Sequence, residues 1–166
     1  MIWISICVFL AMMGGAAFAD DFKNSYVKFS LPTGWTCEAE GTEFFCEPPH
    51  LDGQPVGAMM ILAAKIAGPD DTLTAYVEHL KSVAKAKGPG AMIKAPGYTE
   101  INGVAWVDCT IDGSEIKNYK TRYLAVSKNG IAILYTFSAY KDLYDKLVGS
   151  AVLAVNTLET LDDWKK

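Results

Sequence analysis

The chain has 166 residues, and its 19 acidic residues outnumber its 15 basic ones, which gives a formal net charge of −4. All but one of the basic residues are lysines. Nucleic acid calls for a clustered, arginine-rich basic face, and an anionic membrane surface for a polybasic segment, so this composition argues against both partners.

Residues 1–19 are predicted to be a signal peptide. An apolar run ends at Gly14-Gly15, and Ala17-Phe18-Ala19 forms an A-x-A cleavage pattern just before Asp20. The run is shorter than the roughly 20 residues of a membrane span. We therefore expect cleavage after Ala19, which leaves residues 20–166 as a single exported domain, periplasmic or secreted, without a membrane anchor. Because the segment before the run lacks Lys and Arg, an uncleaved anchor stays open as the alternative.

A short strand is expected at residues 26–31, followed by a β-hairpin over residues 35–46. If the hairpin turns at Gly41-Thr42, Cys37 faces Cys46 in a non-hydrogen-bonded pair, where side chains approach most closely. In the oxidising compartment that an export signal implies, this proximity predicts a Cys37–Cys46 disulfide. Two free thiols, or a register shifted by one residue, are the alternatives.

The middle of the chain predicts a buried strand, a helix and a loop. Residues 55–66 are almost continuously apolar, which is typical of a central strand covered on both faces. Asp70-Asp71-Thr72 then begins a helix whose apolar residues recur at helical spacing from Leu73 to Val83. Gly and Pro residues predict that residues 88–97 form the longest loop.

Two hairpins and a helix complete the chain. Asn102-Gly103 and Asn129-Gly130 have the turn chemistry of two-residue hairpin loops, and helical spacing extends from Tyr140 to Leu158. The order of strands, helix, strands, helix has no βαβ alternation. It therefore predicts an α+β fold in which helices pack on an antiparallel β-sheet.

Several motifs carry a resemblance to a known family. Phe29-Ser-Leu-Pro-Thr-Gly-Trp35 resembles the F-x-L-P-x-G-W opening of PsbP-like and Mog-like domains, and Asp71-Thr-Leu-Thr-Ala-Tyr76 matches a D-x-L-x-x-Y helix start. Asn102-Gly-Val-Ala105 and Leu134-Tyr-Thr-Phe137 extend the similarity, which covers residues 25–160. The chain is thus similar to the PsbP-like/Mog-like (DcrB/LpqN-type) α/β sandwich family. The resemblance implies an α-β-α sandwich that binds protein partners, and it supplies no common catalytic residues. The disulfide hairpin is not a hallmark of that family.

Aromatic side chains are the best candidates for binding a partner. Phe44 and Phe45 are adjacent on a strand and point to opposite faces, so one of them can be exposed. Burial of both under helices or loops is the alternative. With Tyr98 they form the predicted partner-binding set, at the 35–50 hairpin and the 88–98 loop.

The leading hypothesis is an exported, non-enzymatic binding or accessory protein that engages a protein partner in the cell envelope. It predicts no catalytic residue, no metal ligand and no cofactor. The alternative is a small secreted hydrolase or metal-dependent enzyme centred on His50 and the hairpin acids Glu38, Glu40, Glu43 and Glu47. A third option is a ligand carrier with a groove between sheet and helix.

Two further side chains, Cys109 and His79, are expected to have structural roles only. Cys109 shares a strand face with Val107 and Ile111, which predicts a buried thiol, with a reactive thiol as the alternative. His79 lies beside the apolar stripe of the first helix and is expected to be solvated or half-buried.

Overall fold

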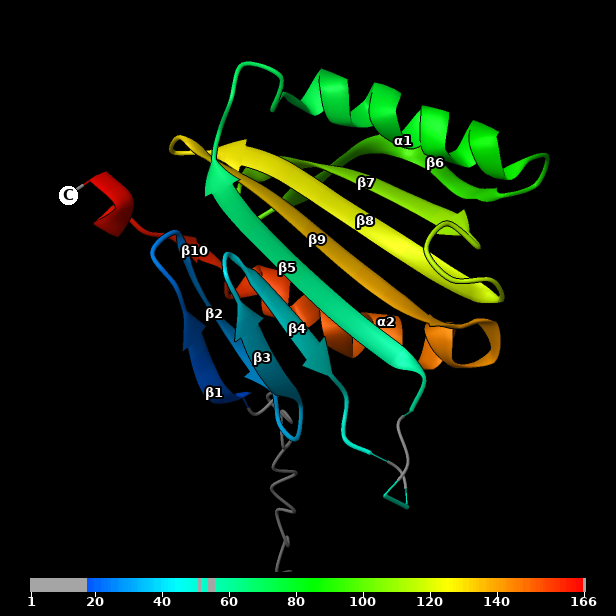
Figure 1. The fold of residues 1–166 in the computed structure, drawn as a ribbon, viewed down its shortest axis with the longest axis horizontal. Coiled ribbons are helices and arrows are strands. Elements are labelled where there is room, and N and C mark those ends of the chain that lie inside the picture. The colour runs from blue at the N-terminus through cyan, green and yellow to red at the C-terminus, as the bar shows by residue number, and fades with distance from the viewer. Residues whose placement is uncertain (1–17, 51, 54–55, 166) are drawn as a thin grey trace, which may run out of the picture.

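The computed structural model describes residues 18–50, 52–53 and 56–165. Residues 1–17 of the predicted signal peptide (residues 1–19) therefore lie outside the described residues, while Phe18 and Ala19 are the first two residues of a strand. Seven strands form an antiparallel sheet in the order β3-β4-β5-β9-β8-β7-β6, and three form a smaller sheet in the order β1-β2-β10. This confirms the predicted α+β fold with an antiparallel sheet (Figure 1). The elements in chain order are β1 (Phe18–Lys23), β2 (Val27–Pro32), β3 (Thr36–Glu40), β4 (Glu43–Glu47), β5 (Ala58–Ile66), α1 (Leu73–Lys87), β6 (Met92–Ile101), β7 (Val104–Asp112), β8 (Tyr119–Lys128), β9 (Ile131–Tyr140), α2 (Lys141–Asn156), β10 (Glu159–Thr160) and the short 3-10 helix η1 (Asp163–Lys165).

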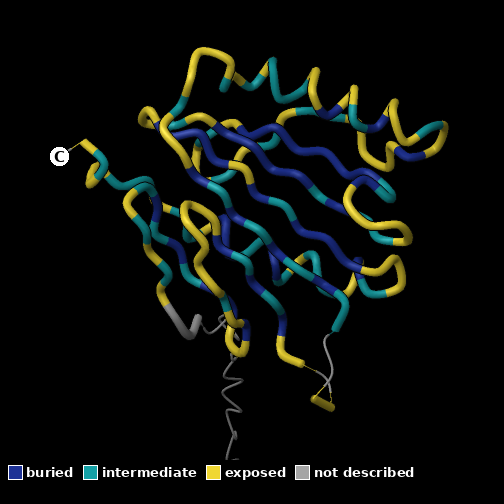
Figure 2. Tube along the Cα trace, viewed as in Figure 1, coloured by how far each residue is buried: buried dark blue, intermediate teal, exposed yellow. Residues whose placement is uncertain are grey.

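The two α-helices pack on opposite faces of the large sheet. Helix α2 and the small sheet share one apolar cluster with the inner residues of β4, β5, β8 and β9. Helix α1 buries Leu80 and Ala84 in a second cluster, against Val107, Cys109 and Ile111 of β7 and residues of β8. Figure 2 shows the buried residues concentrated in the strands of the large sheet, while much of α1 is exposed.

Local sequence signals place most of the turns correctly. Cys37 pairs with Cys46 across the β3–β4 hairpin, and the two are joined by a disulfide with their Cα atoms 4.0 Å apart. The hairpins at Asn102-Gly103 and Asn129-Gly130 form as predicted, with positive φ at all four residues. Thr72 caps α1, since its Oγ1 accepts a hydrogen bond from the backbone N–H of Ala75 at 3.1 Å.

One segment differs from its prediction. Residues 92–97 belong to β6 and are not part of a long loop. β6 is one of the two edge strands of the large sheet, and its pairing with β7 is irregular between Met92 and Gly97. Pro96 has no N–H to donate, and an edge strand with bulges tolerates it because one side of the strand has no neighbour to bond. The Gly and Pro residues of this segment are therefore explained by an irregular edge strand and not by a loop.

The burial of strand β5 also differs from its prediction. The strand occupies a central position between β4 and β9, as expected, but its burial alternates, so that only one face is fully packed. Met60 and Leu62 are fully buried, whereas Met59, Ile61 and Ala63 on the other face are only half-buried. The apolar run therefore does not reflect cover on both faces, and the uncovered side is a candidate site.

Candidate functional site

The candidate site is a face of the large sheet that α1 leaves uncovered. Because directly opposed residues of neighbouring strands share a face, Ile61 of β5 lies beside Phe45 of β4 and Thr136 of β9. Ala63 lies beside Leu134 in the next position. We call this surface the open face and define it by Phe45, Met59, Ile61, Ala63, Leu134 and Thr136.

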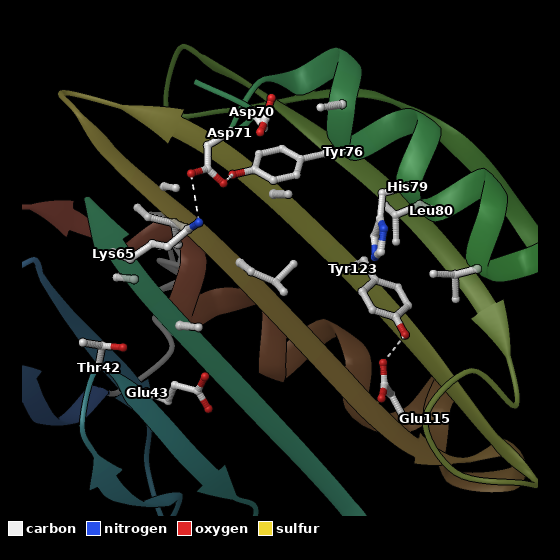
Figure 3. A pocket seen from close by; sticks show the side chains of 18 residues that line it. Thr42, Glu43, Lys65, Asp70, Asp71, Tyr76, His79, Leu80, Glu115 and Tyr123 are labelled. Atoms are coloured by element: carbon white, nitrogen blue, oxygen red, sulfur yellow. Dashed lines mark hydrogen bonds and ion pairs between the residues drawn. The ribbon is translucent and has the colours of Figure 1, made fainter. Parts of the chain in front are cut away.

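The open face is hollowed along α1. A hollow of about 550 Å³ lies between α1 and strands β5, β8 and β9, and Figure 3 shows Tyr76 and His79 of α1 on one side of it and Lys65 and Glu43 on the other. A second hollow of about 610 Å³ adjoins it towards Met59 and Tyr119. The residues that line both hollows are Glu43, Ala63, Glu115 and Leu134. The two hollows therefore form one trough along the sheet.

Carboxylates border the trough on the side of the β3–β4 hairpin. The register sets Glu38 opposite Phe45 and Glu40 opposite Glu43, so these side chains share the open face. Glu47 follows two residues after Phe45 and lies on the same side. The four hairpin acids therefore form a row beside the apolar centre, as the predicted strand alternation implies.

The opposite border and one end of the trough are also polar. Glu115 accepts a hydrogen bond from the Tyr123 hydroxyl at 2.5 Å. At the end of the trough, Asp71 accepts from the Tyr76 hydroxyl at 3.0 Å and from the Gly68 N–H at 2.7 Å, and it lies 3.0 Å from the Lys65 ammonium. The Gly68 N–H, followed by Lys65, holds the pKa of Asp71 below its usual value. Burial, followed by the Asp71 carboxylate, raises the pKa of Tyr76. These contacts tie the start of α1 to the end of β5.

His50 does not assemble a catalytic or metal site with the hairpin acids. It is exposed, and its Nε2 lies 3.3 Å from Oε2 of Glu47, whereas the other acids extend along two strands. Among the described residues, no three His, Cys, Asp or Glu side chains come together in a group that could hold a metal ion. The convergence of polar groups that the enzyme hypothesis requires around His50 is not formed by the described part of the chain.

The structure separates the three predicted partner-binding residues. Phe44 is only 2% exposed and packs on Phe29, so its side chain leaves no surface for a partner. Phe45 lies on the open face, as the strand alternation requires. Tyr98 is 63% exposed but lies on the edge strand β6, at the far side of α1 from Phe45. Of the three predicted residues, Phe45 is therefore the one that lies on the open face.

Ile61 and Leu134 are the central residues of the open face that sequence reasoning missed. Leu134 is 42% exposed although both of its strand neighbours, Ile133 and Tyr135, are buried. The sequence feature that could have indicated this surface is the apolar run of β5. A strand with one solvent face normally alternates apolar and polar residues, so an unbroken apolar run leaves apolar side chains on whichever face stays open. Nothing in the sequence identified which face would stay open, since that depends on where α1 packs.

The arrangement of layers and strands is that of the PsbP/Mog-like α+β sandwich fold. No family model matches the chain, and no curated protein does.

Solved structures do share the fold. The cyanobacterial PsbP (CyanoP) of Synechocystis sp. PCC 6803 has 13% identity and a TM-score of 0.57, over 91% of this chain and 96% of that one. The Saccharomyces cerevisiae Ran-binding protein Mog1p has 10% identity and a TM-score of 0.51, over 92% and 94%. LpqN of Mycobacterium tuberculosis, which is involved in cell envelope biogenesis, has 12% identity and a TM-score of 0.51, over 81% and 83%.

These similarities confirm the fold that the sequence motifs predicted. At such identities they establish the fold and leave the function to the residues of this chain. In the described part of the chain, neither α-helix combines the length and hydrophobicity of a membrane-crossing segment.

Proposed function

We propose that this chain is an exported, non-enzymatic binding protein of the cell envelope that engages a protein partner through the open face. The observation that carries the proposal is an apolar surface over β4, β5 and β9 that neither helix covers. Exposed apolar patches with polar borders are typical of interaction sites, because a soluble domain gains nothing from leaving them in water. Leu134 at 42% exposure is the clearest case.

Two features support the exported location. The first 19 residues have the pattern of a cleaved signal peptide, and the Cys37–Cys46 disulfide suits an oxidising compartment. The names of the similar structures agree with a binding or envelope role, since Mog1p is Ran-binding and LpqN takes part in envelope biogenesis. For this chain we propose only the general role, which is to bind another protein in the cell envelope.

Site-specific photo-crosslinking tests the proposal. The full chain is expressed in its source organism with p-benzoylphenylalanine at position 134 on the open face, or at position 98 on the far edge as the matched exposed control. We expect light-dependent adducts with one protein from position 134 and none with that protein from position 98. The adduct from position 134 should disappear when Ile61→Asp is added, because a carboxylate in the apolar centre opposes docking. Equal adducts from both positions, or none from position 134, would reject the open face as the binding surface.

A further inference from the structure

We infer that the open face takes an amphipathic α-helix of the partner, with lysine or arginine residues on both of its flanks. The inference rests on the proposed function, because it names the chemistry of the partner that occupies the same surface. Three properties of the trough carry it: its width and length, the distribution of charge around it, and its position inside the sheet.

The uncovered surface has the dimensions of one helix. Helix α1 covers strands β6, β7 and β8, which leaves β9, β5 and β4 beside it on the same face. Neighbouring strands lie about 4.8 Å apart, so these three strands span about 10 Å between their axes, close to the diameter of a helix with its side chains. Strand β5 has nine residues and is therefore about 30 Å long, which corresponds to a helix of about 20 residues. A second helix parallel to the sheet would complete the layer that α1 begins.

The charges around the trough favour a basic helix. Glu38, Glu40, Glu43 and Glu47 lie along one border, and Glu115 lies on the other. The Lys65 ammonium at the end of the trough is engaged by Asp71 at 3.0 Å. An apolar stripe with a row of glutamates on one border and Glu115 on the other matches a helix whose apolar stripe is flanked by cations, and it repels an acidic helix.

The position of the trough argues against other occupants. An added β-strand needs a free sheet edge, but β5 and β9 each pair with strands on both sides. A lipid-like ligand is normally enclosed by its pocket, whereas Leu134 on the floor of the trough remains 42% exposed. A second copy docked face to face would bring the two glutamate rows together if the two-fold axis ran across the strands, and would set each row over the Glu115 border of the other copy if the axis ran along them. A basic helix from another protein avoids all three difficulties.

Binding of model peptides to the purified full chain tests the inference. The probe is a fluorescein-labelled peptide of about 18 residues, with leucine at helical i, i+3, i+4 spacing and lysine elsewhere. One control peptide replaces every lysine with glutamate, and a second has the Leu/Lys composition in an order without an apolar stripe. We expect the Leu/Lys helix to bind at least about tenfold more tightly than either control and to gain helicity on binding by circular dichroism.

Variants of the full chain then locate the binding. The combined change Glu38→Gln, Glu40→Gln, Glu43→Gln and Glu47→Gln keeps the side-chain shapes and removes the charge. We expect it to weaken the Leu/Lys peptide by about tenfold and to flatten the dependence of the affinity on salt. The matched control is Glu78→Gln with Glu100→Gln, both exposed and away from the trough, and it should change the affinity by less than about twofold.

The outcomes separate this inference from the proposed function. Equal affinity for the lysine and glutamate peptides, or binding that the four glutamine substitutions leave unchanged, overturns the basic-helix partner while the crosslinks from position 134 can still stand. Binding to phosphatidylethanolamine/phosphatidylglycerol vesicles that Leu134→Glu abolishes also overturns it, because the face would then serve a lipid surface. Loss of the crosslinks from position 134 in cells rejects the proposed function and the inference together.

Discussion

The arginine of this chain, Arg122, lies against a buried carboxylate. Asp108 is 1% exposed, and Arg122 donates to its two oxygens through Nε at 3.0 Å and Nη2 at 2.7 Å. Lys94 adds a third donor at 2.5 Å. Burial acts to raise the pKa of Asp108, but the hydrogen bonds and charges of Arg122 and Lys94 outweigh it and hold that pKa below its ordinary value. A planar guanidinium suits this two-point contact better than lysine would.

This cluster predicts a pH-dependent loss of stability. Asp108→Asn should lower the free energy of unfolding by about 3 kcal/mol at pH 7, since it leaves two cations beside a neutral buried amide. A depressed carboxyl pKa stabilises the fold above the ordinary value of 3.8, and this contribution is lost as the pH falls through the lower folded-state pKa. The difference between wild type and variant in urea denaturation should therefore shrink when the pH is lowered below 3.8.

The control for this prediction is Asp145→Asn, whose side chain is 80% exposed and 3.5 Å from Lys120. It should change the free energy of unfolding by less than about 1 kcal/mol. A constant difference between wild type and Asp108→Asn at pH 7 and pH 3 would contradict the role assigned to the carboxylate.

Among the cysteines of the described residues, Cys109 is the one outside the disulfide, and it is a core residue. It is fully buried between Val107 and Ile111 on the face that α1 covers. Burial, followed by the nearby Asp108 charge, raises the pKa of its thiol to about 11. Because the thiolate is the reactive form, this environment supports the interpretation of Cys109 as a packed hydrophobe.

At the scale of the element, the β3–β4 hairpin has two chemically different faces. Phe44 faces the core and packs edge-on against Phe29, with ring centroids 5.0 Å apart. Phe45 faces outward beside the glutamate row. β3 is an edge strand, so the disulfide to β4 fixes a strand that has one hydrogen-bonded neighbour in the sheet. The hairpin thus holds its glutamates on the outer face, while Phe44 and the disulfide fix the two strands to the core and to each other.

Removing that crosslink predicts a defined loss of stability. Cys37→Ala with Cys46→Ala should lower the free energy of unfolding by about 2–3 kcal/mol, because the closed loop is short and its removal frees the unfolded chain only moderately. Urea denaturation with and without dithiothreitol measures the effect. Reductant should lower the stability of the wild type by a similar amount and leave the double variant unchanged. A wild type insensitive to reductant would show that the crosslink contributes nothing.

At the scale of the molecule, the two faces of the sheet are covered unequally. Helix α2 and the small sheet cover one face, while α1 covers only the half formed by β6, β7 and β8. In the small sheet, Phe22 of β1 stacks on Phe29 at 5.6 Å. Cleavage after Ala19 would remove Phe18, which pairs with Pro32 at the start of β1, and would keep the paired residues Asp21, Phe22 and Lys23. The proposed processing is therefore compatible with the small sheet that supports the core.

Intact mass spectrometry of the protein purified from its source organism tests export and oxidation together. We expect a chain that begins at Asp20 and is two hydrogen atoms lighter than its reduced form, because the signal peptidase and the oxidising compartment act on the same exported molecule. Dithiothreitol should restore the two hydrogens. A mass that retains Met1–Ala19 would contradict cleavage and favour the anchor alternative.

The sequence by itself determined the features that depend on neighbouring residues. Asn102-Gly103 and Asn129-Gly130 specify tight turns through their backbone preferences, and the turn at Gly41-Thr42 sets Cys37 opposite Cys46 by counting alone. The cap at Thr72 likewise acts within one turn of helix. Together with the family-like motifs, these local rules were sufficient to predict the fold class.

Only the tertiary structure decided which apolar residues face solvent. The run in β5 predicted cover on both faces, but α1 packs over β7 and β8 and leaves Ile61 and Leu134 uncovered. The position of β6 at the sheet edge, which accommodates Pro96, was decided in the same way. The physical reason is that burial depends on contacts between segments far apart in the chain, whereas turn and cap preferences are settled within a few residues.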